Sequence, residues 1–492
     1  MKTIQITTAD NVAVALHPVA KGERIEAGGR VLEAAEEIPQ GHKIAVCRIG
    51  SGEHVVKYGF PIGHATRDVE AGCWVHTHNM ATNLEGEMEY RYEPDLHAPE
   101  PVEPEIFMGY RRRDGRAAIR NEIWVIPTVG CVNDVAKKIV KDNQHLAQGS
   151  IDGLYTFPHP FGCSQTGHDH AQTRKLLAAL VRHPNAGAVL VVGLGCENLT
   201  HEQFLQELGE YDADRVKFLT CQEVEDEFAE AERLLKECAA YASSFVREPI
   251  PVSELVIGMK CGGSDGLSGI TANPTVGRFS DMMSARGGST VLTEVPEMFG
   301  AEGFLMNRCV NEAVFEKAVN MINGFKNYFI SHNEVVYDNP SPGNRQGGIT
   351  TLEDKSCGCV QKGGTAPIMD VIGYGEQVVT KGLNMLYGPG NDLVSVTAMT
   401  AAGAHMILFT TGRGTPFGAP APTLKIATNS QLAEKKKGWI DFDAGPVADG
   451  ESVESAAGRL LRLVIQVAGG QKTRTEEMGY REISIFKDGV VL

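Results

Sequence analysis

Residues 122–142, EIWVIPTVGCVNDVAKKIVKD, decide the fold of this chain. An apolar run typical of a buried strand ends in a glycine and a cysteine, and a segment with helical periodicity follows at once. The same order recurs at 154–163 (LYTFPHPFGC) and 188–196 (AVLVVGLGC), and at 254–261 (ELVIGMKC) the glycine follows the cysteine instead. Strands that alternate with helices predict a parallel α/β sheet, whose ligands bind outside the carboxyl ends of the strands. Four cysteines are therefore expected together at such an edge: Cys131, Cys163, Cys196 and Cys261.

Changes in composition divide the chain into parts. Residues 1–92 consist of short alternating runs broken by glycine and proline, which is typical of a small all-β domain. Residues 93–105 (EPDLHAPEPVEPE) place four prolines among acidic residues and predict an extended linker. Strand and helix patterns then predict two α/β units, 106–250 and 251–492.

Composition and charge limit the class of protein. The 492 residues are too many for one core, and 42% hydrophobic with 22% charged residues is ordinary for globular domains. The net charge of −16 argues against nucleic acid or an anionic membrane as a partner. Neither a signal peptide nor a membrane span is evident, so eleven cysteines predict reduced thiols in the cytoplasm. A homodimer is the expected assembly.

The strand-end cysteines have the chemistry of metal ligands, because thiolates bind iron, zinc and iron–sulfur clusters. The alternative for each is a small buried residue at a strand end. Two histidines also alternate in a segment that reads as a strand, so their side chains would share a face and one divalent ion; the alternative is an ordinary hydrogen-bonded pair. The predicted metal ligands are His76, His78, Cys131, Cys163, Cys196 and Cys261. Cys357 and Cys359, one residue apart, are closer than usual ligand spacing and stay unassigned.

Histidines and glycine-rich loops accompany these cysteines. Residues 157–170 (FPHPFGCSQTGHDH) hold three histidines around one cysteine, and at least one should be functional. CGGSDG (261–266) and TGRGTPFG (411–418) let backbone amides approach a ligand closely, and Arg413 would supply a cation for a carboxylate. Neither loop has a nucleotide-binding signature.

Together these motifs resemble the altronate and galactarate dehydratase family. The resemblance runs over nearly the whole chain, through PTVGCVN, HPNAGAVLVVGLGCEN, CGGSDGLSGITANP, TLEDKSCGC and TGRGTP, with a small SAF-type (β-clip) domain in front that ends in HTHN. It implies a hydro-lyase that converts D-altronate to 2-keto-3-deoxy-D-gluconate with ferrous iron or manganese. The alternatives are a related lyase acting on galactarate or sulfolactate, or a sugar-acid-binding regulator without catalysis.

The implied reaction assigns roles to residues. A base must take the C2 proton, and a cation must stabilise the enediolate that forms at the carboxylate. The expected catalytic residues are His159 and His170. The expected substrate-binding residues are Ser264, Asp265, Asn391, Asp392, Arg413 and Lys425. The cysteines fit either a single ion or an iron–sulfur cluster held by three or four thiolates, and a third arrangement places the ion on the two histidines of HTHN.

Overall fold

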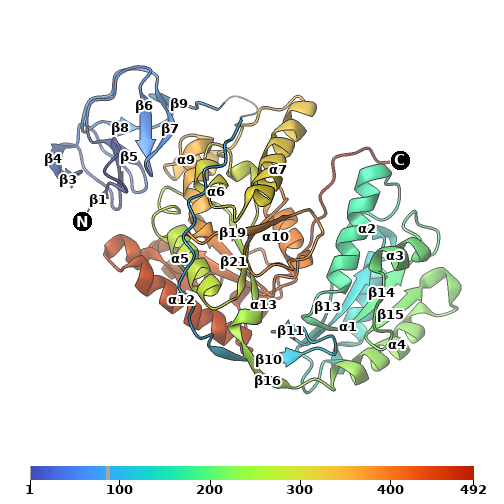
Figure 1. The fold of residues 1–492 in the computed structure, drawn as a ribbon. Helices are drawn as coiled ribbons and strands as arrows, with labels where there is room; N and C mark the ends of the chain where they lie inside the picture. Colours follow the sequence, from blue (N-terminus) through green and yellow to red (C-terminus); the bar gives the residue numbers. More distant parts are fainter. Residues whose placement is uncertain (1, 85–88) are drawn as a thin grey trace.

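The computed structural model describes residues 2–84 and 89–492, which form three units (Figure 1). The first unit is all-β, with the small sheets β1-β2-β5-β8, β3-β4 and β6-β7-β9. Its strands are β1 (Thr3–Ile4), β2 (Val12–Ala15), β3 (Arg24–Ala27), β4 (Arg30–Glu33), β5 (Lys43–Ala45), β6 (His54–Lys57), β7 (Phe60–Ala65), β8 (Trp74–Val75) and β9 (Met80–Ala81). The predicted all-β front domain is confirmed.

The second unit is built on the four-stranded parallel sheet β13-β12-β14-β15, and β10, β11 and β16 form a separate antiparallel sheet at its base. Its strands are β10 (Ile106–Arg111), β11 (Ala117–Ala118), β12 (Glu122–Pro127), β13 (Gly153–Thr156), β14 (Ala186–Gly193), β15 (Val216–Thr220) and β16 (Arg247–Pro251). Its helices are α1 (Asn133–Asp142), α2 (Gly167–Val181), α3 (His201–Leu208) and α4 (Glu227–Ala242).

The third unit contains a seven-stranded parallel sheet of order β19-β20-β18-β17-β21-β22-β23. Its strands are β17 (Val256–Cys261), β18 (Ser289–Leu292), β19 (Ile368–Ile372), β20 (Gly382–Leu386), β21 (Met406–Thr411), β22 (Thr423–Ala427) and β23 (Phe442–Asp443). Its helices are α5 (Ala272–Ala285), α6 (Gly303–Met306), α7 (Glu312–Ser331), α8 (Pro342–Gln346), α9 (Leu352–Cys359), α10 (Asp392–Ala401), α11 (Ser430–Lys435), α12 (Val453–Ala468) and α13 (Arg474–Glu477). The predicted pair of parallel α/β units is confirmed.

Strand β12 shows why continuous apolar runs form these sheets. Its successive side chains point to opposite faces. Ile123 and Val125 join a core with residues of α1 and α4, whereas Trp124 and Ile126 join a core with residues of α2 and α3. Helices cover both faces, so every position of the strand is buried and apolar residues need not alternate.

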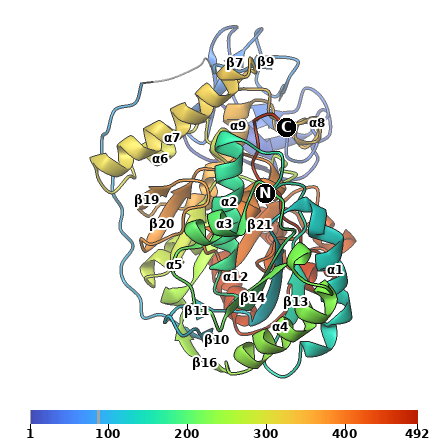
Figure 2. The ribbon, with the colours of Figure 1, turned by 90° about the vertical axis from the view of Figure 1, so that its right-hand side faces the viewer.

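The three units pack against one another. Figures 1 and 2 show the first unit on one side of the third unit and the second unit on the other. Residues 89–105 form no regular element and run along the third unit, where the N–H of Val102 donates to the carbonyl of Ala285 at 2.8 Å. The core of the second unit continues into α10 and β21 of the third. Among the described helices, none is both long and apolar enough to span a bilayer.

One buried ion group ties the first unit to the third. The carboxylate of Asp354 in α9 accepts from the ammonium of Lys43 at 2.7 Å and from that of Lys57 at 3.0 Å. All three side chains are almost inaccessible to solvent. Although burial alone would raise it, the two ammonium groups hold the pKa of the Asp354 carboxyl well below its usual range.

Candidate functional site

A crevice of about 530 Å³ opens at the carboxyl ends of the strands of the third unit. Strand β17 lies there between β18 and β21, the point at which the strand order reverses direction and at which open α/β sheets bind ligands. Aromatic residues of α7 and the C-terminal segment form its apolar side. Its polar and charged wall consists of Cys261, Glu297, Asp338, Asn339, Ser341, Asn344, Lys355, Asn391 and Asp392.

Two thiols and a carboxylate meet at the buried end of this crevice. The Sγ atoms of Cys261 and Cys359 lie 3.3 Å apart, and Oε2 of Glu297 lies 3.3 Å from the first and 3.1 Å from the second. In the part of the chain that the structure describes, these three residues are the one group of three or more His, Cys, Asp or Glu ligand atoms within 4.8 Å of one another. Two sulfur donors with one carboxylate oxygen suit a divalent ion of the iron or zinc type, so this group can bind a metal.

Three lysines surround the metal-binding group. Lys362 donates to Sγ of Cys261 at 3.0 Å, and Lys355 donates to Oε1 of Glu297 at 2.8 Å. Lys260 contacts the carboxylates of Glu294 and Asp392. Although burial alone would raise it, these ammonium groups hold the pKa of the Glu297 carboxyl well below its usual range. Three ammonium groups thus balance three carboxylates in a place where an unpaired charge would be costly.

The four predicted strand-end cysteines divide between two places. Cys261 belongs to the metal-binding group of the third unit. Cys131, Cys163 and Cys196 follow β12, β13 and β14 at the carboxyl edge of the sheet of the second unit. Cys131 and Cys196 are exposed and Cys163 is half-buried.

The two predicted catalytic histidines differ in how their rings are used. His159 is buried, its Nε2 lies 2.8 Å from the carbonyl of Pro127, and its Nδ1 accepts from the N–H of Phe161 at 3.2 Å. Burial lowers the pKa of His159 to about 4, so the ring is neutral and both nitrogens hold the loop together. His170, in the first turn of α2, has a buried Nε2 that no described residue pairs.

The predicted substrate-binding residues lie in different places. Asn391 and Asp392 line the crevice. Asp265 and Arg413 line a second hollow of about 430 Å³ beside it, which Gln40 of the first unit closes on one side. Ser264 lies between the two, buried, and its Oγ has no partner among the described residues.

Lys425 is buried on β22, and its Nζ has no hydrogen-bond partner in the described chain. The ammonium lies 3.5 Å from the ring centre of Phe409, and the charged groups that act on it are Asp392, Asp441 and Lys260. Burial lowers the pKa of Lys425 from its ordinary value near 10.5 to about 7.

Substitution of Lys425 by methionine should stabilise the protein most at low pH. Between pH 7 and 10.5 the unfolded lysine binds a proton that the folded one lacks, so wild-type stability rises with pH through this window. Below pH 7 both states are protonated and the full cost, about 5 kcal/mol at about 1.4 kcal/mol per pKa unit, is present. Urea unfolding of the wild type and of Lys425→Met at pH 6, 8 and 10 measures the difference in free energy of unfolding. A Lys425→Met advantage that is the same at all three values would contradict this titration.

His76 and His78 lie in a turn. The strand expected through HTHN is wrong, because β8 ends at Val75 and Oδ1 of Asn79 accepts from the N–H of His76 at 2.9 Å, which closes the turn. Nδ1 of His76 lies 3.2 Å from Oγ1 of Thr350, in the third unit, and the ring stacks on Trp74. His76 therefore lies at the contact between the first and third units, whereas His78 is exposed and its ring lies against Trp74.

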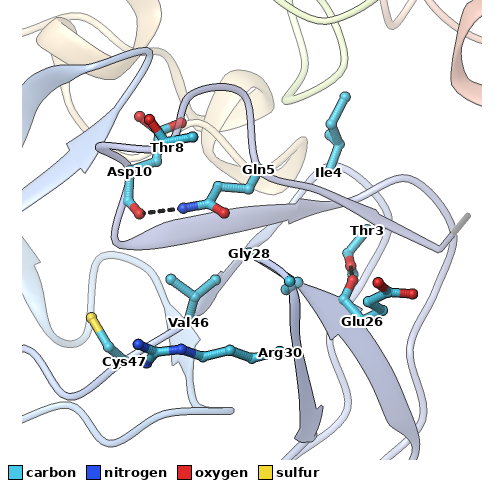
Figure 3. A pocket seen from close by; sticks show the side chains of 12 residues that line it. Thr3, Ile4, Gln5, Thr8, Asp10, Glu26, Gly28, Arg30, Val46 and Cys47 are labelled. Atoms are coloured by element: carbon cyan, nitrogen blue, oxygen red, sulfur yellow. Dashed lines mark hydrogen bonds between the residues drawn. The ribbon is translucent and has the colours of Figure 1, made fainter.

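A larger hollow of about 700 Å³ lies within the first unit, and Figure 3 shows its lining, with Gln5 directed at Asp10 and Arg30 extended toward Cys47. Nε2 of Gln5 donates to the carbonyl of Asp10 at 2.7 Å, and the carboxylate of Asp10 accepts from Thr7. These polar groups already satisfy one another. The crevice of the third unit, with its buried thiols and charges, is the better site for chemistry.

Sequence reasoning left out Glu297, Cys359 and Lys355. Two of them had a local signal: Cys359 belongs to a CGC motif, and Lys355 lies one helical turn before it. Positions two apart on a helix face different sides, so Cys359 reaches the crevice while Cys357 faces Asp354 and the first unit. Glu297, in a short turn after β18, has no local signal of this kind.

The chain matches one family over all three units. Residues 1–83 match the altronate/galactarate dehydratase SAF domain, 109–243 the second domain of D-galactarate dehydratase/altronate hydrolase, and 252–491 the C-terminal domain of D-galactarate/altronate dehydratase. The chain is 50% identical to altronate dehydratase of Escherichia coli over all of both chains, and 51% identical to that of Bacillus subtilis over 99% of both. Identity to galactarate dehydratase (L-threo-forming) of Escherichia coli is 32%, over 99% of this chain and 97% of that one. These matches show that the chain belongs to the altronate/galactarate dehydratase family.

Proposed function

We propose that this chain is a hydro-lyase that removes water from D-altronate to give 2-keto-3-deoxy-D-gluconate. The observation that carries the proposal is the identity of 50% and 51% to two altronate dehydratases over essentially full length, well above the 32% to galactarate dehydratase. The crevice of the third unit supports it, because a hollow of about 530 Å³ with amide, carboxylate and ammonium groups suits a polyhydroxy acid.

Three groups in the crevice wall are suited to bind such a substrate. Oδ1 of Asn391 caps α10 by accepting from the N–H of Leu393 at 3.1 Å, which leaves its amide N–H groups for a substrate hydroxyl. Asp392, held by Lys260 at 2.9 Å, can accept from another hydroxyl. The ammonium of Lys355 can pair with the substrate carboxylate.

Cys261, Glu297 and Cys359 would hold a single divalent ion at the buried end of the crevice. Their donor set favours ferrous iron over manganese, because manganese prefers oxygen ligands. When bound, such an ion is a Lewis acid that stabilises negative charge on a substrate oxygen. Lys355 and Lys362, which now contact two of these ligands, would keep the surrounding charges balanced.

His170 is the residue to which we assign removal of the C2 proton. Its Nε2 has no partner among the described residues, and it follows Asp169, whose carboxylate accepts from the N–H groups of Asp488 and Gly489. These lie two and three residues beyond Phe486, which lines the crevice. The proton leaves C2, the C3–O bond breaks, the hydroxyl departs as water with one proton, and the enol becomes the 2-keto acid. His159, with both ring nitrogens engaged, positions the loop that carries Cys163.

The assay is product formation from D-altronate by protein purified without oxygen, before and after chelation and after return of ferrous iron. We expect turnover that chelation removes and iron restores, with galactarate a poorer substrate. Lys355→Met should lower kcat/KM by about 10- to 100-fold, since a hydrogen bond to a charged group contributes about 1.5–3 kcal/mol. Lys381→Met, outside the crevice, is the matched control. Absence of keto-acid product from the iron-loaded wild type would overturn the assignment.

The proposed compartment is the cytoplasm, and the proposed assembly is a homodimer. Support for the compartment comes from the eleven cysteines, none of which is in a disulfide in the described structure. Twofold pairing is the commonest assembly of soluble oligomers, and light scattering of the purified protein would measure it.

A further inference from the structure

Three glycine–cysteine pairs lie at one edge of the sheet of the second unit. Strands β13, β12 and β14 are adjacent and parallel, so the loops that follow them leave the sheet on the same side. Pro127 of β12 lies opposite Val192 of β14, and Cys131 and Cys196 each come four residues after these paired positions. Cys163 lies in the loop after β13, on the other side of β12. The topology thus gathers three thiols from three neighbouring strands.

The three loops are hydrogen-bonded to one another. The N–H of Gly130 in the first loop donates to the carbonyl of Phe161 in the second at 2.8 Å. The N–H of Leu199 in the third donates to the carbonyl of Gly162 at 3.0 Å. His159, with both ring nitrogens bonded to backbone, fixes the second loop against the end of β12. The loops are therefore held in fixed positions relative to one another.

Each of the three cysteines follows a glycine, and neighbouring atoms lie too close to that glycine for a larger residue to fit. A Cβ on Gly162 would lie 1.9 Å from the carbonyl oxygen of Thr128, and one on Gly130 would lie 3.0 Å from that of His159. Gly162 and Gly195 also have positive φ angles, +96° and +127°, which other residues rarely adopt. Close approach of the backbones, which only glycine allows, brings the loops that carry the thiols together.

The surroundings of these thiols are those of a binding site. Two of the three are exposed, whereas a cysteine that only fills a core is buried. Beside Cys163, the amide Nε2 of Gln165 and the ring Nε2 of His170 are buried and have no partner among the described residues. Gln165 is only 3% exposed, so its unpaired N–H groups call for an acceptor. Ser164 has a φ of +58°, a strained conformation that is typical of functional loops.

We propose that Cys131, Cys163 and Cys196 bind an iron–sulfur cluster of the [4Fe–4S] class through three thiolates, leaving one iron without a protein thiolate. A single ion requires close ligand atoms, and in the described structure these three thiols form no group within 4.8 Å. In a cluster each thiolate binds a different iron, so the sulfur atoms stand farther apart. A sulfide ion of the cluster would accept from the amide N–H groups of Gln165, which have no partner among the described residues.

The cluster site is joined to the crevice by the C-terminal segment. Phe486 lines the crevice, and six residues later the N–H of Leu492 donates to the carbonyl of Ser164, next to Cys163, at 2.9 Å. The C-terminal segment therefore connects the loop that carries Cys163 with the wall of the crevice. The proposal stands independently of the substrate, because cluster content is measured without one.

The test uses the full chain, purified without oxygen and reconstituted with ferrous iron and sulfide. We expect about four iron and four acid-labile sulfide per chain, with a broad visible absorption. Cys131→Ser, Cys163→Ser and Cys196→Ser should each lower bound sulfide at least severalfold. Cys221→Ser, at the end of β15 in the same sheet and half-buried, is the matched control and should retain the cluster, as should Cys261→Ser.

Thiol alkylation and circular dichroism of the apoprotein separate loss of the cluster from misfolding. Cys131 and Cys196 are exposed, so a maleimide should label them in the apoprotein and fail to label them after reconstitution. Iron without sulfide in the wild type would overturn the proposal. Full sulfide content in the triple serine variant would overturn it too, as would equal loss in Cys221→Ser with native circular dichroism. None of these outcomes depends on activity toward D-altronate.

Discussion

Replacing Cys359 with alanine should abolish tight binding of a single divalent ion and, with it, turnover of D-altronate. Cys359 supplies one of three ligand atoms, and its Sγ lies 3.3 Å from that of Cys261 and 3.1 Å from the carboxylate of Glu297. Changes to residues that only orient a metal ligand cost about 10–100-fold in affinity or activity, so loss of a ligand should cost at least about 100-fold in both. Metal content after dialysis and calorimetric titration with ferrous iron, in the absence of sulfide, measure the effect.

Cys357→Ala is the control for this variant. Cys357 is buried in the same helix α9, two positions away, and faces Asp354 instead of the crevice. It should therefore keep the ion, whatever it costs in stability. Retention of one tightly bound ion per chain by Cys359→Ala would remove this residue from the site, and loss of the ion in Cys357→Ala alone would show that the helix was assigned the wrong face.

Asp354→Asn should loosen the first unit from the third. The substitution removes the carboxylate that pairs two buried ammonium groups, those of Lys43 and Lys57. Breaking a buried ion pair from one side costs about 3–5 kcal/mol, because it leaves uncompensated charge. We expect an early thermal transition, absent from the wild type, together with faster proteolysis of the first unit. Asp68→Asn, which removes an exposed partner of Arg48 in the same unit, should leave the transition unchanged.

A triple variant tests why Asp354→Asn weakens the docking of the first unit on the third. Lys43→Met, Lys57→Met and Asp354→Leu together remove all three charges and keep apolar bulk, and such replacements are often neutral or stabilising. Recovery of the single transition would identify unpaired charge as the reason for the loss. If the triple variant were as loose as Asp354→Asn, specific hydrogen bonds such as that of Lys43 to Thr350, at 2.7 Å, would be responsible instead.

Strands buried on both faces were predictable from the sequence because such strands are continuous apolar runs. β12 and β14 are buried at nearly every position, and the runs IWVIP and AVLVVG mark them. The turn at HTHN was not predictable from the sequence. It depends on one side chain, that of Asn79, which accepts from the backbone N–H three residues earlier. The alternation of polar residues in this segment does not indicate that such a hydrogen bond forms a turn.

The candidate site was predictable in part. A cysteine at the end of β17 follows from the strand pattern, but its meeting with Glu297 and Cys359, 36 and 98 residues further along the chain, depends on how α9 packs across the sheet. The predicted units 106–250 and 251–492 already separate Cys261 from the other three strand-end thiols, so the expectation that all four meet at one edge was wrong. The roles assigned to individual histidines, cysteines and substrate-binding residues stay predictions.

The course of residues 89–105 along the third unit has a consequence for how the protein holds together. This segment joins no sheet, and the first unit is fixed by side-chain contacts to α9 rather than by the segment. Its physical effect is that of a tether, which keeps the first unit at a high effective concentration beside its docking face. Docking of the first unit on the third is thus an intramolecular equilibrium. Weaker contacts therefore suffice to keep the first unit in place than two separate chains would need.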